Sequence, residues 1–234
     1  MDQLLYTLYT VIFVALSVWA ARLWWQSRQI GTLVVLIVML AMIYENAVLA
    51  LGVVIGHGSL LEALSWGRFV GYAVIPPLLV VSSAELARRA GVAWAGRREV
   101  RIGAWVVALT LAAFALFVEV IGRQIEPRIY NDVVRYMWVS KGVPPLGVIL
   151  MNLIVIGLGF AIWRKSRYAG LLLAGIFLFF GDGMAAGQYV IGSGIEMAFM
   201  VVVVSAEAWA LGHFDRRAAP AVLQSRAQTH AVGD

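Results

Sequence analysis

The sequence contains no cysteine and few charged residues. The absence of cysteine excludes disulfide bonds, thiolate metal ligands and a cysteine nucleophile. Charged residues make up 13% of the chain and hydrophobic residues 62%, whereas soluble proteins have about 25% charged residues. This composition excludes an ordinary soluble domain, and we expect an integral membrane protein.

Histidine is also scarce. Of the three histidines, His57 is predicted in a loop, His213 at a helix end and His230 in the C-terminal tail. These places do not favour a zinc site built from three histidines. We therefore expect no metal and no cofactor.

The hydrophobic residues form seven runs that are each long enough for a membrane-spanning helix. Such a helix needs ~20 mostly apolar residues to cross a hydrocarbon core of about 30 Å. The runs are Leu4 to Trp24, Ile30 to Val54, Arg68 to Leu86, Ile102 to Gly122, Val143 to Trp163, Tyr168 to Ile191 and Ile195 to Phe214. We predict an all-α, polytopic membrane protein with seven transmembrane helices in residues 1–217. Residues 218–234 are small, polar and aperiodic, which predicts a disordered cytoplasmic tail.

The basic residues predict the orientation of the bundle. One set of connecting segments and the tail hold 13 of the 18 basic residues, and the opposite set holds 5. By the positive-inside rule, the N-terminus is outside and the C-terminus inside. No Ala-x-Ala site closes the first run, so we expect a retained helix. Because the basic residues lie in short loops beside helix ends, topology and anionic lipid headgroups explain them better than a nucleic-acid partner does.

Several polar side chains are predicted at a similar depth in the outer half of the bundle. At ~1.5 Å per residue, Glu45 lies roughly 22 Å along the second run, and Asp182 in the sixth run reaches nearly the same height. Arg68 is predicted to open the third helix and Glu119 to close the fourth. The uncharged polar residues at this depth are Asn46, Asn152 and Gln188. Ionisable residues inside a membrane usually face a cavity or a partner, so we predict a polar cavity that opens outward.

A structural role for the same charges is the alternative. Glu45 or Asp182 could pair with Arg68 and hold the helices together. Pro76 and Pro77 predict a kink in the third helix, because proline removes a backbone donor. The longest connection, residues 123–142, is predicted to be a loop that lies on the membrane, or alternatively a lid.

Glu207 stands apart, near the middle of the last helix. Ser82 and Ser83 of the third helix are expected at a similar depth. If Glu207 has no cationic partner, burial favours its neutral form, and the carboxyl becomes a proton donor. The alternative is a neutral carboxyl that only makes a hydrogen bond to a neighbouring helix.

Two segments resemble microbial rhodopsins. "WGRFVGYAVIPPLL" in the third helix is similar to their third helix, and "FMVVVVSAE" resembles their final helix, where Ser-Ala precedes the lysine that binds retinal. The resemblance implies a rhodopsin-like bundle with an outside N-terminus. Glu207 replaces the retinal lysine, Val203 the aspartate of the last helix, Gly71 the proton acceptor and Ser82 the proton donor. These departures imply a bundle without retinal photochemistry.

Two further families resemble parts of the chain. Tyr44-Glu45 and Glu207 match places where integral membrane terpene cyclases carry an aromatic-glutamate pair and a late acidic residue. The order "YENAVLALG", "RF" and "EVIGRQIEP" is similar to that of uncharacterised bacterial seven-helix membrane proteins. The bacterial resemblance implies the cytoplasmic membrane as the location.

We therefore predict a protein that binds an isoprenoid or similar membrane lipid and uses a carboxyl to protonate an alkene or epoxide. The candidate catalytic residues are Glu45, Asp182 and Glu207. The candidate substrate-binding residues are Tyr44, Asn46, Arg68, Tyr72, Glu119, Asn152, Phe177, Phe180, Gln188 and Trp209; the aromatic ones can stabilise a carbocation. One alternative is a non-enzymatic rhodopsin-like receptor or carrier of a lipid or carotenoid. The other is passage of protons or cations along the three carboxylates.

Overall fold

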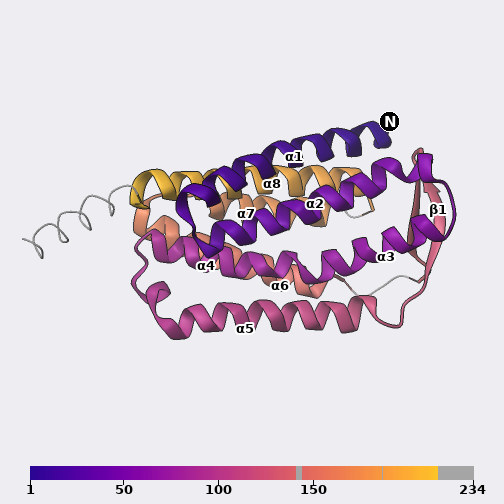
Figure 1. The fold of residues 1–234 in the computed structure, drawn as a ribbon. Coiled ribbons are helices and arrows are strands. Elements are labelled where there is room, and N and C mark those ends of the chain that lie inside the picture. Colours follow the sequence, from indigo (N-terminus) through magenta and orange to yellow (C-terminus); the bar gives the residue numbers. More distant parts are fainter. Residues whose placement is uncertain (141–143, 186, 216–234) are drawn as a thin grey trace, which may run out of the picture.

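The protein is an elongated bundle of helices that is closed at one end by a β-hairpin (Figure 1). The computed structural model describes residues 1–140, 144–185 and 187–215. The predicted tail, residues 218–234, lies outside the described residues. The N-terminus lies at the hairpin end, where the Met1 amino group is 3.1 Å from Asp132 Oδ2.

The helices run roughly along one long axis (Figure 1). They are α1 (Asp2–Ser27), α2 (Ile30–Ile55), α3 (Ser59–Val74), α4 (Leu79–Arg89), α5 (Arg98–Ala115), α6 (Leu146–Ser166), α7 (Gly170–Met184) and α8 (Tyr189–Ala210). Short 3-10 turns occur at Pro76–Leu78 and Ala93–Gly96, and π-helical turns at Leu116–Val120 and Leu211–Asp215. The hairpin consists of β1 (Ile125–Tyr130) and β2 (Val133–Trp138).

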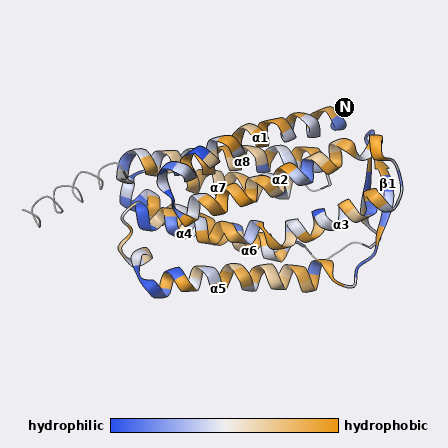
Figure 2. Ribbon diagram, in the orientation of Figure 1, coloured by the Kyte–Doolittle hydropathy of each residue, from blue (hydrophilic) through white to orange (hydrophobic). Residues whose placement is uncertain are grey.

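Six spans within the described residues are long and apolar enough to cross a membrane. The helix α7 is apolar but has only 15 residues. Figure 2 shows hydrophobic residues along the length of the helices and hydrophilic ones gathered near the turn between α4 and α5. Large apolar side chains such as Leu40, Val106 and Leu173 are exposed on the outside of the bundle. An apolar exterior of this kind is that of an integral membrane protein.

The third span differs from its prediction. It covers Ser59–Arg89 as α3, a 3-10 turn and α4, so Arg68 lies well inside the span and does not open it. The prediction was wrong because it treated Arg68 as a boundary, whereas this side chain is buried beside Glu45. The break falls at Pro76 and Pro77, which supply no backbone N–H to a helix.

The boundary between the last two helices also differs from its prediction. The helix α7 ends at Met184, not near Ile191, and α8 begins at Tyr189, not at Ile195. Gly187 lies between them and has φ 85°, in the left-handed region that favours glycine. Gln188 therefore lies at the start of α8 and not inside the preceding helix.

The predicted loop after the fourth span is a two-stranded antiparallel hairpin, which corrects the prediction of an all-α chain in this segment. Tyr130 pairs with Val133 across a turn formed by Asn131 and Asp132, whose φ values are 47° and 66°. Asn and Asp tolerate this left-handed conformation, which matches the twist of a tight hairpin. The hairpin covers one end of the bundle (Figure 1).

Close backbone contacts fix two of the packing interfaces. A Cβ atom at Gly52 of α2 would lie 1.9 Å from the carbonyl oxygen of Val134, so only glycine lets the hairpin sit against α2. A Cβ atom at Gly159 of α6 would lie 2.7 Å from the backbone nitrogen of Leu172 in α7.

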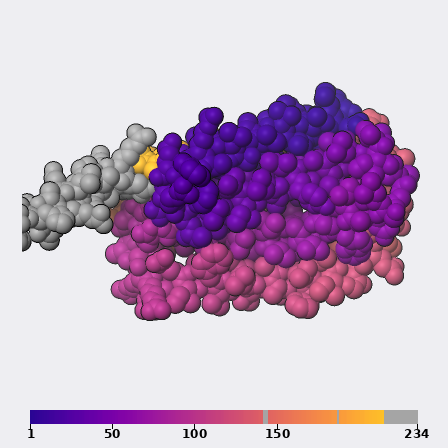
Figure 3. Space-filling view, in the orientation of Figure 1, coloured from indigo at the N-terminus to yellow at the C-terminus, as the bar shows by residue number. Residues whose placement is uncertain are grey.

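In the space-filling view, α1 to α4 cover most of one face and α5 its lower border (Figure 3).

Candidate functional site

A cavity of about 1260 Å³ lies at the hairpin end of the bundle. Residues of α1, α2, α3, α6, α7 and α8 line it, together with the π-helical turn at Glu119 and the hairpin. Aromatic side chains form part of the wall: Phe69, Tyr72, Trp138, Phe179, Phe180 and Tyr189. Within the described residues, no group of three or more His, Cys, Asp or Glu side chains is arranged to hold a metal ion.

Charged groups face this cavity from several helices. Arg68 on α3 and Glu45 on α2 form a long ion pair, with 3.9 Å between Nε and Oε1. The Tyr72 hydroxyl donates a hydrogen bond of 3.2 Å to Oε1 of Glu196 on α8. Asp182 on α7 also lines the cavity and interacts electrostatically with Glu196. With Glu119 of the π-helical turn, four carboxyl groups therefore share one cavity.

Most of the polar residues grouped by depth in the sequence lie around this cavity. They are Glu45, Arg68, Glu119, Asn152, Asp182 and Gln188, and the candidates Tyr72 and Phe180 join them. Asn46 is buried on α2 but does not line the cavity; its amide donates to the carbonyl oxygen of Met42 at 2.9 Å. Glu119 Oε1 accepts a hydrogen bond from the backbone N–H of Gly147, so it also caps the start of α6.

Besides Asn46, four of the candidate residues lie elsewhere. The Tyr44 hydroxyl donates to the carbonyl oxygen of Leu64 at 2.8 Å, outside the cavity. Phe177 is half-exposed on the outside of the bundle. The ring of Trp209 stacks on Tyr168, with 4.3 Å between the ring centroids. Glu207, like these three, is absent from the cavity wall.

Several cavity residues are not among the sequence candidates, and Glu196 and Arg135 are the two that matter most for the site. Glu196 is the second residue of the predicted last run, which begins at Ile195, whereas α8 begins seven residues earlier, at Tyr189. Arg135 was assigned to a loop, whereas it lies on β2 and its guanidinium carbon is 4.2 Å from the centroid of the Tyr189 ring. The available signal was the pair Asn131-Asp132, two turn-forming residues between segments that contain Ile, Val, Tyr and Trp, which favour strands.

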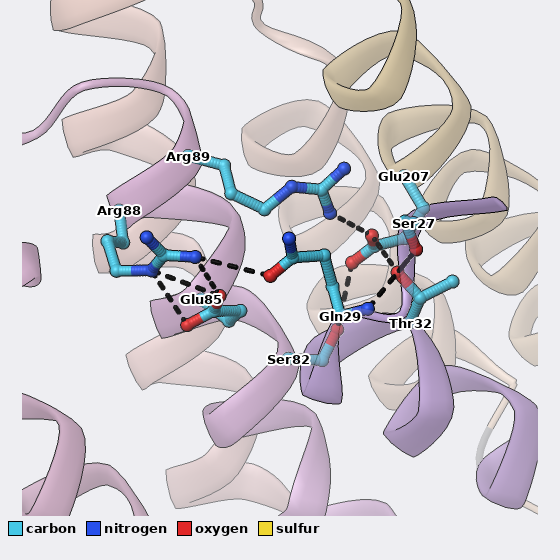
Figure 4. A network of polar contacts seen from close by, with 8 residues as sticks. All are labelled: Ser27, Gln29, Thr32, Ser82, Glu85, Arg88, Arg89 and Glu207. Atoms are coloured by element: carbon cyan, nitrogen blue, oxygen red, sulfur yellow. Dashed lines mark hydrogen bonds and ion pairs between the residues drawn. The ribbon is translucent and has the colours of Figure 1, made fainter. Parts of the chain in front are cut away.

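Glu207 is the centre of a separate polar network at the opposite end of the bundle (Figure 4). Arg89 Nη1 donates to its Oε2 at 2.5 Å, and the Thr32 hydroxyl donates to the same oxygen at 2.8 Å. The Ser82 hydroxyl is 3.5 Å from Oε1. Both Glu207 and Arg89 are buried. The condition for a proton donor, a carboxyl without a cationic partner, is therefore not met.

The depth predicted for Glu207 also needs correction. Its partners are Thr32, near the start of α2, and Arg89, the last residue of α4. The network thus lies near the helix ends and not at mid-depth. A neighbouring pair extends it, because Arg88 contacts Glu85 and donates to Gln29 Oε1 at 3.3 Å (Figure 4).

Apolar side chains separate the network from the cavity. On α8, Glu196 and Glu207 are eleven positions apart, roughly 16 Å at ~1.5 Å per residue. The buried residues between them are Phe199, Met200, Val203, Val204 and Ala206. On α2, the buried residues between Thr32 and Glu45 are Val34, Val35, Val38, Met39 and Met42. The structure therefore holds two polar regions and not one.

A scan of the chain against models of protein families finds no match, and a search of curated proteins finds no significant match. The resemblances to microbial rhodopsins, terpene cyclases and bacterial seven-helix proteins therefore stay predictions. We interpret the two polar regions from their own geometry.

Proposed function

We propose that the protein is a membrane enzyme that binds an isoprenoid or similar lipid in the cavity and starts its chemistry by protonating a double bond or epoxide. The observation that carries this proposal is the cavity of about 1260 Å³, which combines an aromatic wall with four carboxyl groups. Ligand pockets commonly measure about 300–1,000 Å³, so this one has room for a lipid.

Glu196 is the proposed acid. It is hydrogen-bonded to the Tyr72 hydroxyl, and no cationic side chain in the described part of the chain lies within ion-pair distance of it. An unpaired charge inside a membrane costs at least ~2.5 to 3.5 kcal/mol, which favours the protonated carboxyl. Glu207 is paired with Arg89, so we no longer propose it as the acid.

The proposed reaction is an isomerisation. The Glu196 proton forms a new C–H bond with the electrons of a ligand double bond, which leaves a carbocation on the neighbouring carbon. A second double bond attacks this cation and closes a ring. A carboxylate then removes a proton from the ring and a double bond forms; Glu196 can accept that proton itself, or Asp182 can pass it back. The product has the same mass as the substrate.

The aromatic wall supports a cationic intermediate. Tyr72 and Phe180 were candidates for this task, and Phe69, Trp138 and Tyr189 line the same cavity. The negative face of an aromatic ring attracts a cation, by ~0.5–1 kcal/mol at exposed sites and about 2 when desolvated. The cavity already holds such contacts, since the guanidinium carbon of Arg68 is 4.8 Å from the centroid of the Phe69 ring.

We further propose that the bundle has an outside N-terminus, which makes the hairpin and the cavity mouth face outward. The support is the excess of basic residues near the network end, including Arg88, Arg89 and Arg98. Alkaline phosphatase fused after Arg217 should be inactive. Strong activity of this fusion in the periplasm would reverse the orientation.

Turnover in detergent tests the enzymatic proposal. The purified protein should convert an extracted or synthetic isoprenoid into a product of equal mass and different chromatographic retention. Glu196→Gln keeps an acceptor for the Tyr72 hydroxyl but has no acidic proton, so it should fold normally and lose at least 100-fold in turnover, in line with the ~10²–10⁴-fold effect of general acids. Undiminished turnover by this variant would remove Glu196 as the acid.

Two other outcomes identify the alternatives. Purification with an unaltered lipid and no turnover would favour a rhodopsin-like carrier or receptor. Loss of a pH gradient in liposomes would favour conduction, although the apolar side chains between Glu196 and Glu207 argue against a continuous polar path.

A further inference from the structure

Two buried arginines in the cavity have donors that the protein does not use. Arg68 is 4% exposed and Arg135 is 6% exposed, and both line the cavity. Neither guanidinium donates a hydrogen bond to any described residue, and Arg68 Nη1 and Arg135 Nε are fully buried. Each guanidinium carries five N–H donors in a planar fork that fits a carboxylate or phosphate.

The two arginines come from separate elements, and the fold brings them together. Arg68 lies on α3, and Arg135 reaches the cavity from β2. Arg135 is close enough to act electrostatically on Arg68, and both side chains line the cavity, so two positive charges share this part of it. Buried like charges repel, and a buried charge without hydrogen bonds is costly. The protein maintains both charges there nonetheless.

The cavity's own carboxyl groups do not satisfy these donors. Glu45 Oε1 is 3.9 Å from Arg68 Nε, beyond hydrogen-bond distance. Glu196 accepts its hydrogen bond from Tyr72. The guanidinium of Arg135 lies over the Tyr189 ring. This contact is with the face of the ring and uses none of the N–H donors that point along the guanidinium plane. An anion between Arg68 and Arg135 would use the free donors and relieve the repulsion.

We propose that Arg68 and Arg135 bind the anionic head group, a phosphate or a carboxylate, of the lipid that occupies the cavity. This inference rests on the proposed function for the lipid nature of the ligand. The apolar part of the ligand extends along Val148, Ile149 and Phe180, which line the same cavity. The substrate class is thus an amphipathic lipid with an acidic head, for example a prenyl phosphate, and not a neutral hydrocarbon.

Other arginines of the cavity are less suited to this task. Arg128 is about half-exposed and is paired with Glu126. Arg123 donates to the carbonyl oxygen of Ser140 at 2.7 Å and its guanidinium carbon is 4.4 Å from the centroid of the Trp138 ring. Their donors are already in use, which makes Arg128→Met a control: it removes a cavity-lining charge without removing a free buried donor.

Binding to the full-length protein in detergent, measured with three probes, tests the inference. The probes are a prenyl monophosphate, the prenyl alcohol of the same chain length, and inorganic phosphate. We expect the wild-type protein to bind the prenyl phosphate at least tenfold more tightly than the alcohol. Arg68→Met and Arg135→Met should each lower the affinity for the phosphate at least tenfold and change that for the alcohol less than twofold. Arg128→Met should leave both affinities within twofold.

Arg135→Met is the decisive variant, because Arg135 forms no ion pair with a described residue and its loss strands no carboxylate. Its thermal unfolding midpoint, measured on the same preparation, should stay near that of the wild type. Equal wild-type affinity for the prenyl phosphate and the alcohol would overturn the inference. Inorganic phosphate that binds as tightly as the prenyl phosphate would also overturn it, since the site would then hold a free anion.

These outcomes are separate from those of the proposed chemistry. If the protein prefers the prenyl phosphate but never alters it, the anion site is supported and the enzymatic proposal is contradicted. If the protein cyclises isoprenoids but binds the phosphate and the alcohol equally, the enzymatic proposal is supported and the anion site is contradicted.

Discussion

The two polar regions of the bundle differ in how completely their hydrogen bonds are satisfied. In the network at one end, the Glu207 carboxylate contacts Arg89, Thr32 and Ser82. In the cavity at the other end, Arg68 and Arg135 keep buried nitrogen atoms without hydrogen-bond partners among the described residues. The network is complete without a ligand, whereas the cavity is not.

This difference separates structural from functional charges. Buried polar groups in native proteins are nearly always hydrogen-bonded, so the exceptions need an explanation. The Glu207 network joins α2, α4 and α8 and needs nothing further. The cavity holds unused donors in a volume of about 1260 Å³. We therefore propose that the network serves helix packing and that the cavity serves ligand binding.

The largest effect is expected for Arg89→Met. The substitution leaves the buried Glu207 carboxylate without its arginine, and breaking a buried pair in this way costs about 3 to 5 kcal/mol. The midpoint of thermal unfolding in detergent should fall strongly. A matched double variant, Arg89→Met with Glu207→Met, removes both charges and should recover most of the loss. A double variant as unstable as the single one would argue against a structural pair.

Thr32→Val should produce the next largest effect. Valine has nearly the shape of threonine but removes the hydroxyl that donates to Glu207 Oε2 at 2.8 Å. Hydrogen bonds to charged groups contribute about 1.5 to 3 kcal/mol. Ser82→Ala is the comparison, because its contact with Glu207 is 3.5 Å long and should matter less. Equal losses in the two variants would contradict the geometry of the network.

Gly52→Ala should loosen the hairpin that closes the cavity. The new Cβ would lie 1.9 Å from the Val134 carbonyl oxygen, so the backbone must move. Forced overpacking typically costs about 1 to 3 kcal/mol. Hydrogen exchange in residues 125–138 should increase. Gly71→Ala is the control, since a Cβ there meets no atom within 4 Å, and it should leave the exchange of the hairpin unchanged. Unchanged exchange in Gly52→Ala would mean that the hairpin is not held against α2.

Ser65→Ala should have the smallest effect on the unfolding midpoint. It compares the loss of an unsatisfied hydroxyl with the loss of the satisfied Thr32 hydroxyl. Ser65 is fully buried on α3, but its hydroxyl oxygen has no hydrogen-bond partner among the described residues. Removing an unsatisfied hydroxyl costs little and can stabilise a protein. We expect an unchanged or slightly higher unfolding midpoint. A loss as large as that of Thr32→Val would show that Ser65 is in fact satisfied.

The sequence predicts the spans better than their ends. Runs of apolar residues identify the helices because the membrane requires length and hydrophobicity. Their ends depend on tertiary contacts that one sequence does not display. Arg68 is tolerated inside α3 because Glu45 lies opposite, and the chain turns between α7 and α8 at Gly187, which adopts a left-handed conformation. Orientation stays a prediction from the basic residues.

The sequence also anticipates part of the cavity. Depth along the helices groups Glu45 and Asp182, which share the cavity in the structure. The depth of a residue along its helix does not show which way the side chain faces or which residue it pairs with. The sequence therefore did not predict that Arg89 pairs with Glu207. Glu196 was missed because the predicted helix began too late, and Arg135 because the hairpin was taken as a loop.

The most direct test compares two variants for turnover and stability on the same preparations. The double variant Arg89→Met with Glu207→Met removes the central ion pair of the network, and Glu196→Gln changes one carboxyl of the cavity. We predict that the folded double variant keeps wild-type turnover of the lipid, whereas Glu196→Gln keeps the wild-type unfolding midpoint and loses turnover. Full turnover by Glu196→Gln, together with loss of turnover in a stably folded double variant, would contradict the assignment of function to the cavity.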